Sequence, residues 1–259
     1  MNPPISAVLY SVLLLLGMLG MLEIGRVLGL RRRRVESASE RESLSTVEAA
    51  VFALFGLLMA FTFSGAASRF NEKRMLVAEE ANAIGTAFLR LDVVAKEAQP
   101  SLREHFRQYV DSRLETYRRL PDMAAAMEEM ARSAKLQGVI WSESVAAVGL
   151  PGSHLSAGLL LLPALNTMID ITTTRTMAMQ VHPPGIVFAL LFVLGLICSL
   201  LAGYRMAVGE HRSWLHIAGF AVITVVIVYV TIDVEYPRTG LFRLSDADQV
   251  LVQLRSSMN

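Results

Sequence analysis

A polar stripe between residues 166 and 175 holds the side chains that come closest to a binding site. Asn166 and Asp170 lie four residues apart, one helical turn, with Thr173 or Thr174 on the next turn and Arg175 close by. This stripe could bind a cation, and Asp170 could equally form an ion pair with an arginine between helices. Buried charges usually persist only when they are paired, so we favour a structural polar network of Asn166, Asp170 and Arg175.

Signatures of catalysis and of resident cofactors are missing from the sequence. Adjacent helical residues point about 100° apart, so Glu79 and Glu80 cannot act as a facing acid and base pair. We find no glycine-rich phosphate loop and no Gly-x-Ser-x-Gly elbow. The single cysteine, Cys198, lies in an apolar run and suits membrane packing. The histidines are scattered, at positions His105, His154, His182, His211 and His216. We therefore expect no enzyme, no cofactor and no metal site.

The composition is typical of a polytopic membrane protein with a water-facing part. Of the 259 residues, 53% are hydrophobic and 18% are charged. The formal net charge of +1 gives no indication of nucleic-acid binding. Four consecutive arginines, residues 31–34, follow a membrane span within ten residues, so we interpret them as a topology anchor beside anionic lipid headgroups. The expected surroundings are a lipid bilayer, with no nucleic acid.

The chain is organised around one long helix predicted over residues 45–98. Its first half, residues 47–67, is apolar and long enough to cross a hydrocarbon core, and its second half is amphipathic without a proline. Ser45 and Thr46 suit a helix N-cap, and Pro100 predicts that the helix ends just before it. At about 1.5 Å per residue such a helix exceeds the 40–45 Å or so of a bilayer, so it must extend into water.

The water-facing region is predicted to be helical as well. Apolar residues recur at helical spacing over residues 102–117, with Arg113 among the charged residues on the other faces. The next helix, residues 122–148, carries methionines that we expect to fill a core, Met123, Met127 and Met130. The apolar run 157–165 contains Pro163 and is too short to span, which suits a buried core helix, although a re-entrant segment stays open.

These patterns together predict an all-α polytopic protein whose extramembrane helical domain is formed by extension of the second membrane helix. The four expected spans cover residues 5–25, 47–67, 186–202 and 214–232. The expected division of the chain is 1–68 for the first two spans, 69–182 for the helical domain, 183–235 for the last two spans and 236–259 for a tail. A short amphipathic helix capped by Ser245 is predicted over residues 245–256 of that tail.

One family resemblance rests on the end of the second membrane span. The segment Phe61-Thr-Phe-Ser-Gly-Ala-Ala-Ser-Arg-Phe-Asn-Glu-Lys-Arg resembles the second membrane helix of bacterial bestrophins, which are pentameric anion or cation channels. The whole chain is more closely similar to the bacterial bestrophin-like membrane proteins. The segments that carry this likeness are residues 65–70, 80–91, 164–170 with Arg175, and 232–244.

The resemblance implies a multi-pass protein of the bacterial inner (cytoplasmic) membrane that conducts inorganic ions. It also implies a homo-oligomer, a pentamer by analogy, whose second helices surround a pore with an apolar neck. Eukaryotic members carry an acidic calcium clasp that we cannot locate in this sequence, so calcium gating is not carried over.

Two faces of the second helix could supply the neck. Alignment on Arg69 and Glu72 selects Ala53, Leu57 and Phe61, whereas spacing alone equally offers Phe55, Met59 and Phe63 on the adjacent face. Either triplet would stack apolar rings that could gate by dewetting. The expected pore mouth is lined by Ser64, Ser68, Arg69, Asn71 and Glu72. A stripe of small residues would let neighbouring helices approach closely: Gly56, Ala60, Ser64 and Ser68.

The sequence leaves two alternatives open for the orientation of the chain in the membrane and two for its function. The positive-inside rule groups Arg26 and residues 31–34 with Arg205 and Arg212 on the cytoplasmic side, which leaves the helical domain outside. The bestrophin pattern puts that domain and the N-terminus in the cytoplasm, and we lean to this orientation. The alternative to a channel is a non-conducting membrane scaffold or sensor whose helical domain, residues 99–149, binds a partner.

Overall fold

The structure, a computed structural model, describes residues 3–32, 38–120, 122–207, 214–237 and 245–258. Within these residues the chain is helical and forms no strand, which confirms the predicted all-α class. The helices are α1 (Pro3–Arg32), α2 (Ala38–Leu89), α3 (Gln99–Arg118), α4 (Met123–Val148), α5 (Ala157–Gln180), α6 (Gly185–Met206), α7 (Trp214–Glu235) and α8 (Ser245–Ser257), with a short 3₁₀ helix η1 (Arg90–Val93) after α2.

The chain divides into two compact units. The membrane unit consists of Met1–Ser68 and His182–Tyr236, and the extramembrane unit consists of Arg69–Val181 and Pro237–Asn259. The tail, which the sequence suggests as a separate segment, thus contributes α8 to the extramembrane unit. The proposed capping of α8 by Ser245 lies outside the described side chains.

Helix α2 runs through Arg69 without interruption, as predicted, but both of its ends differ from the expectation. It starts at Ala38 rather than Ser45, and it ends at Leu89, where η1 takes over. Pro100 was expected to close this helix and instead stands in the first turn of α3. A proline is tolerated there because the N–H groups of a first turn have no helical partner.

Among the residues that the structure describes, four helices are long and apolar enough to cross a membrane. The candidate stretches are Ala7–Arg32, Leu44–Val93, Ala157–Met206 and Ala218–Glu235. The third stretch covers both α5 and α6, of which α6 belongs to the membrane unit and α5 to the extramembrane unit. The predicted count of four spans is therefore confirmed by length and composition.

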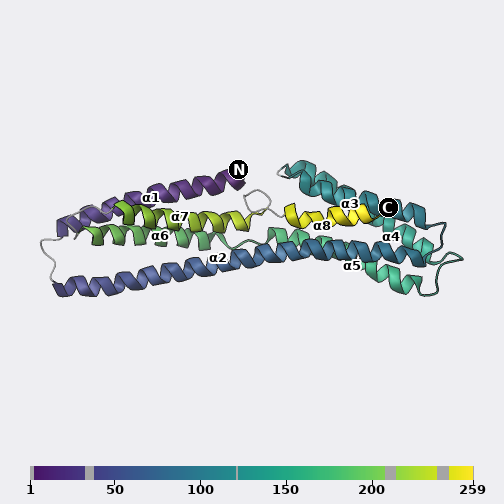
Figure 1. The fold of residues 1–259 in the computed structure, drawn as a ribbon, viewed down its shortest axis with the longest axis horizontal. Coiled ribbons are helices and arrows are strands. Elements are labelled where there is room, and N and C mark those ends of the chain that lie inside the picture. The colour runs from purple at the N-terminus through teal and green to yellow at the C-terminus, as the bar shows by residue number, and fades with distance from the viewer. Residues whose placement is uncertain (1–2, 33–37, 121, 208–213, 238–244, 259) are drawn as a thin grey trace. The chain divides into compact units, whose positions relative to one another are not determined.

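Close packing of α1 against α6 holds the membrane unit together, and Figure 1 shows α1, α6 and α7 side by side. A Cβ atom on Gly25 would lie 1.9 Å from the carbonyl oxygen of Leu200. A Cβ atom on Gly203 would lie 2.0 Å from the carbonyl oxygen of Leu22. Only glycine permits backbones to approach this closely, which is a common solution between membrane helices.

The C-terminal ends of α1 and α6 lie at the same end of the membrane unit. A Cβ atom on Gly29 would contact the backbone of Tyr204, so the basic residues that end α1 and α6 lie on one side, as loop counting predicts. There the side chain of Arg205 pairs with that of Glu48, at 3.2 Å between Nη1 and Oε2. Arg212, the other basic residue assigned to this side, lies outside the described residues.

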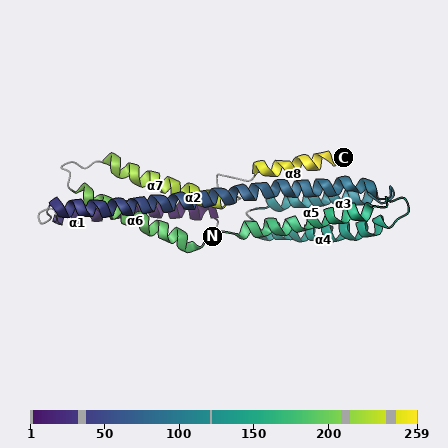
Figure 2. The same ribbon diagram turned by 90° about the horizontal axis from the view of Figure 1, so that it is seen from below.

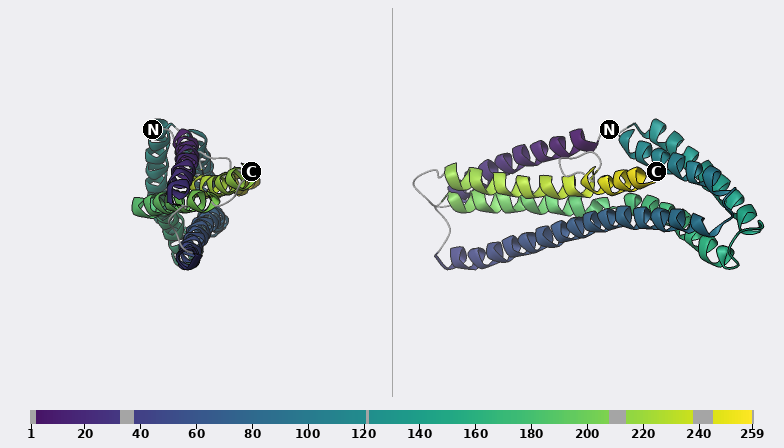
Figure 3. Two further views of the ribbon diagram at one scale, coloured as in Figure 1. Left: turned by 90° about the vertical axis from the view of Figure 1, so that its left-hand side faces the viewer. Right: turned by 45° about the vertical axis from the view of Figure 1, so that its right-hand side comes forward.

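The extramembrane unit has one apolar core to which α2, α3, α4, α5 and α8 contribute (Figure 2). On α3 the predicted apolar face is buried, with Phe106 and Tyr109 fully inaccessible. Helix α4 packs against α3 (Figure 3) and begins where predicted, because the carboxylate of Asp122 accepts hydrogen bonds from two backbone amides of its first turn. The apolar start of α5 is buried in this core through Leu161 and Leu165, as expected of a core helix.

Two expectations about this unit are wrong. Met123 and Met127 are 62% and 64% exposed, so they do not fill a core, because they follow the outer side of α4. Arg113 was assigned to a polar face and is only 3% exposed. Its position is four residues after Tyr109 and seven after Phe106, which places it on the buried side of α3.

Candidate functional site

One side of α2 packs inside the membrane unit. Phe55 is 3% exposed and forms a small apolar core with Leu191 and Cys198 of α6. Met59 lies one turn further on and packs against the same core. Thr62 continues this side, with its hydroxyl donating to the carbonyl oxygen of Leu58 at 2.8 Å. This side of α2 therefore holds the helix to the rest of the membrane unit.

The opposite side of α2 has no such packing. Leu57 is 52% exposed and Phe61 is 67% exposed, and Ala53 is exposed one turn before them. At about 100° per residue, Leu57 lies some 160° around the helix from Phe55. Of the two triplets offered by spacing, only Ala53, Leu57 and Phe61 are exposed at all three positions.

The second triplet does not form a common exposed surface. Phe63 is 41% exposed, but its companions Phe55 and Met59 are engaged with α6. Phe55 and Met59 thus pack inside the membrane unit rather than standing on the exposed side of α2, because the two triplets lie on opposite flanks of the helix.

The expected mouth residues are distributed over both units. Ser64 and Ser68 are exposed on the membrane unit. Asn71 and Glu72 are exposed on the extramembrane unit, and Arg69 is partly buried there.

A buried ion network joins three helices of the extramembrane unit. Glu80 of α2 is fully inaccessible and pairs with Arg113 of α3, at 2.5 Å between Oε1 and Nε, and with Arg175 of α5. Arg113 also donates to the phenolic oxygen of Tyr117 at 2.6 Å. The guanidinium of Arg175 lies over the ring of Tyr117, 4.3 Å from its centre. These contacts fix α2, α3 and α5 to one another through charge-assisted hydrogen bonds.

The neighbouring Tyr109 shows how strongly this region is shielded from water. Burial, followed by the negative charge of Glu80, raises the pKa of Tyr109 well above its ordinary value. Its phenolic oxygen accepts a hydrogen bond from the amide of Gln137 at 3.0 Å. The phenol is thus held neutral between α3 and α4.

The polar network in the structure consists of other residues than the sequence predicts. Arg175 is 5% exposed and belongs to a buried ion network, but its partner is Glu80 and not Asp170. Asn166 and Asp170 are exposed on another side of α5. Sequence reasoning missed Glu80 and Arg113, although each has a detectable signal. Both lie at core positions of their helices, between apolar residues three or four places away.

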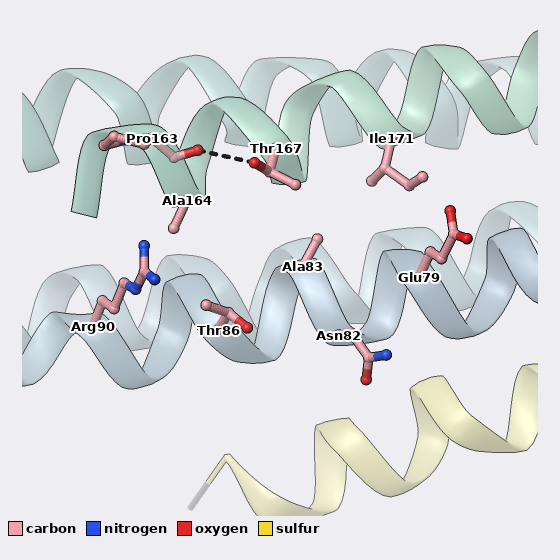
Figure 4. A pocket seen from close by; sticks show the side chains of 9 residues that line it. All are labelled: Glu79, Asn82, Ala83, Thr86, Arg90, Pro163, Ala164, Thr167 and Ile171. Carbon is pink, nitrogen blue, oxygen red and sulfur yellow. Dashed lines mark hydrogen bonds between the residues drawn. The ribbon is translucent and has the colours of Figure 1, made fainter. Parts of the chain in front are cut away.

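A pocket of about 440 Å³ lies between α2 and α5 in the extramembrane unit. Figure 4 shows Glu79 and Arg90 toward its two ends, with Ala83 and Ala164 between the helices. The guanidinium of Arg90 donates to the carbonyl oxygen of Leu160 at 2.6 Å, and this contact joins η1 to the first turn of α5. The groove thus has a largely apolar wall, with charged side chains toward its ends.

Metal ligands do not converge anywhere in the part of the chain that the structure describes, where no three His, Cys, Asp or Glu side chains lie close enough to share an ion.

Comparisons with known proteins identify the family. The Bestrophin-like domain model matches residues 22–249. The fold is similar to that of a crystallised bacterial bestrophin homologue from Klebsiella pneumoniae, with a TM-score of 0.60 and 16% sequence identity. The match covers 96% of this chain and 98% of that one. No curated protein matches the sequence. Since the family model spans most of the chain, from the end of α1 into α8, the protein belongs to the bestrophin-like family.

Proposed function

We propose that the protein is an oligomeric ion channel of the bacterial cytoplasmic membrane. In this proposal α2 of each copy lines a common pore, and rings of Leu57 and Phe61 form its apolar neck. The family supports an ion channel, and the bestrophin pattern suggests a pentamer. The observation that carries the proposal is the stripe of Ala53, Leu57 and Phe61, which points away from the packing side of α2.

The small contact area of α2 supports a role between protomers. Only 11% of its apolar window is buried, compared with 22% to 33% for the other three candidate spans. A helix that packs so little within its own chain has most of its surface available for lipid, neighbouring copies or water. Gly56 and Ala60 lie beside the stripe, and residues of this size allow helices of adjacent copies to approach closely.

Two exposed serines favour a pore axis over acyl chains for the outward stripe. Ser64 and Ser68 each lie within about 20° of Leu57 around the helix axis. Both are exposed in the membrane unit. Hydroxyl groups in membrane helices usually face other helices or water, because hydrocarbon offers them no partner. The stripe thus changes from apolar to polar along one side, as a neck that opens into a mouth would.

The neck would control ion passage by its hydration. Leu57 and Phe61 are one turn apart, so in a ring of copies they would stack as two apolar rings about 6 Å from each other along the axis. Water leaves a narrow apolar constriction readily, and an ion then has no hydration shell to carry through it. Ser64 and Ser68 would line the mouth. Arg69, Asn71 and Glu72 stay predictions for the mouth on the extramembrane unit.

Single-channel recording in planar bilayers tests the proposal. Replacing Phe61 with alanine widens the neck, and we expect a unit conductance about twofold or more above that of the wild type. Phe63→Ala is the matched control, because Phe63 is also an exposed phenylalanine of α2 but lies some 160° around the helix. Equal conductance of the wild type and Phe61→Ala in correctly assembled oligomers contradicts the neck. A wild-type protein that forms no channels supports the scaffold alternative.

A further inference from the structure

A second pocket in the extramembrane unit is lined by a positively charged side chain and by no carboxylate. It has a volume of about 300 Å³ and lies among α3, α4 and α5. Its polar lining consists of Arg113, Ser133, Gln137, Thr172, Thr173 and Thr176. Arginine is the only charged residue in this lining, and no carboxylate of the described chain faces it there.

The arginine that lines this pocket belongs to a buried cluster with one positive charge in excess. Arg113 and Arg175 are 3% and 5% exposed, and both share the single carboxylate of Glu80. Arginine keeps its proton in proteins, so neither guanidinium can become neutral to relieve this excess. An uncompensated buried charge is costly, and a counterion in contact with it lowers that cost.

Nearby groups compensate this charge only in part. The phenolic oxygen of Tyr117 accepts one hydrogen bond from Arg113, and its ring lies against Arg175. Glu129 accepts a hydrogen bond from Ser112, but it lies 3.7 Å from Arg132, which balances its charge from the solvent side. The excess positive charge at the pocket therefore remains.

Arg113 still has hydrogen-bonding capacity on the pocket side. Its Nε donates to Glu80 and its Nη2 donates to Tyr117, and among the described residues its Nη1 has no partner. Thr173 contributes an exposed hydroxyl to the same lining. The hydroxyl of Ser133 is already engaged, because Ser112 donates to Glu129 and Ser133 therefore donates to Ser112. A cation would be repelled from this lining, whereas a small anion would meet the guanidinium of Arg113 and the hydroxyl of Thr173.

We propose that this pocket binds a small monovalent inorganic anion, of the class of chloride or nitrate, against the guanidinium of Arg113. The site lies wholly within the extramembrane unit, and it does not depend on whether α2 lines a pore. Anion binding there would stabilise the contact between α3, α4 and α5.

Thermal unfolding of the purified full chain in detergent tests this site with chloride as the probe. Chloride is titrated against gluconate at constant ionic strength, so that only the identity of the anion changes. A ligand that binds the folded state raises the unfolding temperature in a saturable way. We expect this rise in chloride for the wild type, together with broadening of the ³⁵Cl NMR signal by the protein.

Two pairs of variants locate the effect. Thr173→Glu places a carboxylate in the pocket lining and should weaken the apparent chloride affinity at least about tenfold, since like charges repel. Thr174→Glu is its matched control, because Thr174 is exposed one residue further along α5 but does not line the pocket. Arg113→Gln should abolish the chloride response, and Arg118→Gln, which removes an exposed guanidinium outside the pocket, should retain it.

Two sets of results decide whether the pocket binds chloride. Saturable stabilisation by chloride in the wild type and in Thr174→Glu, weakened in Thr173→Glu, supports the site. Identical unfolding temperatures in chloride and gluconate, or a chloride response that Thr173→Glu retains in full, overturns it.

Discussion

Replacing Glu80 with glutamine should destabilise the extramembrane unit more than the same kind of replacement at any other Asp or Glu of α3 or of the part of α2 that follows Ser68. The substitution keeps the shape of the side chain but leaves Arg113 and Arg175 without their shared anion. Glu80 is fully inaccessible, so solvent cannot take its place. At an effective dielectric constant near 20, each lost ion pair is worth about 4 kcal/mol at 4 Å.

The net effect is smaller than the sum of the two pairs. Removing the carboxylate also removes its own desolvation cost, which amounts to several kcal/mol for a buried ion. Breaking a buried pair by removing one partner usually costs 3–5 kcal/mol, so we expect a loss of about 4 kcal/mol in the free energy of unfolding. This is a large part of the 5–15 kcal/mol or so that stabilises a typical domain.

Urea unfolding in detergent can measure this loss through one fluorophore. The chain has two tryptophans, and Trp141 packs against the core of the extramembrane unit. A Trp214→Phe background leaves Trp141 as the reporter of that unit. Glu104→Gln is the control, because Glu104 is an exposed glutamate of α3 that pairs with Arg107, and its loss should leave the midpoint unchanged.

A double-mutant cycle completes the test. Glu80→Gln combined with Arg175→Met should cost less than the two single changes together, because the second change removes a charge that the first left unpaired. A coupling energy of about 1 kcal/mol or more is expected. A loss below about 1 kcal/mol for Glu80→Gln alone would refute the reasoning that the buried carboxylate neutralises both guanidinium groups.

Two further predictions concern other parts of the molecule. Gly203→Ala should lower the unfolding temperature of the full chain markedly, because the new methyl group would meet the backbone of Leu22. Gly20→Ala is the control and should not lower it, because Gly20 has open space around it. Equal effects of the two substitutions would contradict the close contact of α1 and α6. Tyr109→Phe loses the hydrogen bond from Gln137 and should be less stable than the wild type at neutral pH. The raised pKa of Tyr109 means that the unfolded chain ionises first, so wild-type stability falls as the pH rises above about 10 and the gap to the variant should narrow. A gap that stays constant between pH 9 and 11 in urea titrations argues against a shielded phenol.

The sequence predicts the helices of this protein well because their patterns are local. The apolar run of 47–67 and the amphipathic period that follows it have no proline or glycine pair between them, and α2 is continuous there. The start of α4 at Asp122 follows from capping chemistry alone. The error at Pro100 arises because a proline can either end one helix or begin the next, and only the conformation of residues 90–98 decides between the two.

Pairing between helices is harder to predict from the sequence. Asp170 and Arg175 are five residues apart and their spacing predicts one network, yet Arg175 binds Glu80, 95 residues away along the chain. Which face of α5 meets α2 depends on the packing of the whole unit. The same limit applies to the neck, where Phe55 and Phe61 look alike in sequence and only contact with α6 separates them.

A block by cadmium ions of channels that carry Phe61→Cys tests the central claim most directly. Cys198 is the only native cysteine and is fully buried, so the wild type serves as the unblocked reference. If Phe61 faces a shared axis, a ring of thiolates will bind Cd²⁺, and micromolar Cd²⁺ will block the current until a chelator removes it. Phe63→Cys channels should conduct unchanged. Full current through Phe61→Cys channels in Cd²⁺, or an equal block of both variants, would contradict a pore lined by this stripe of α2.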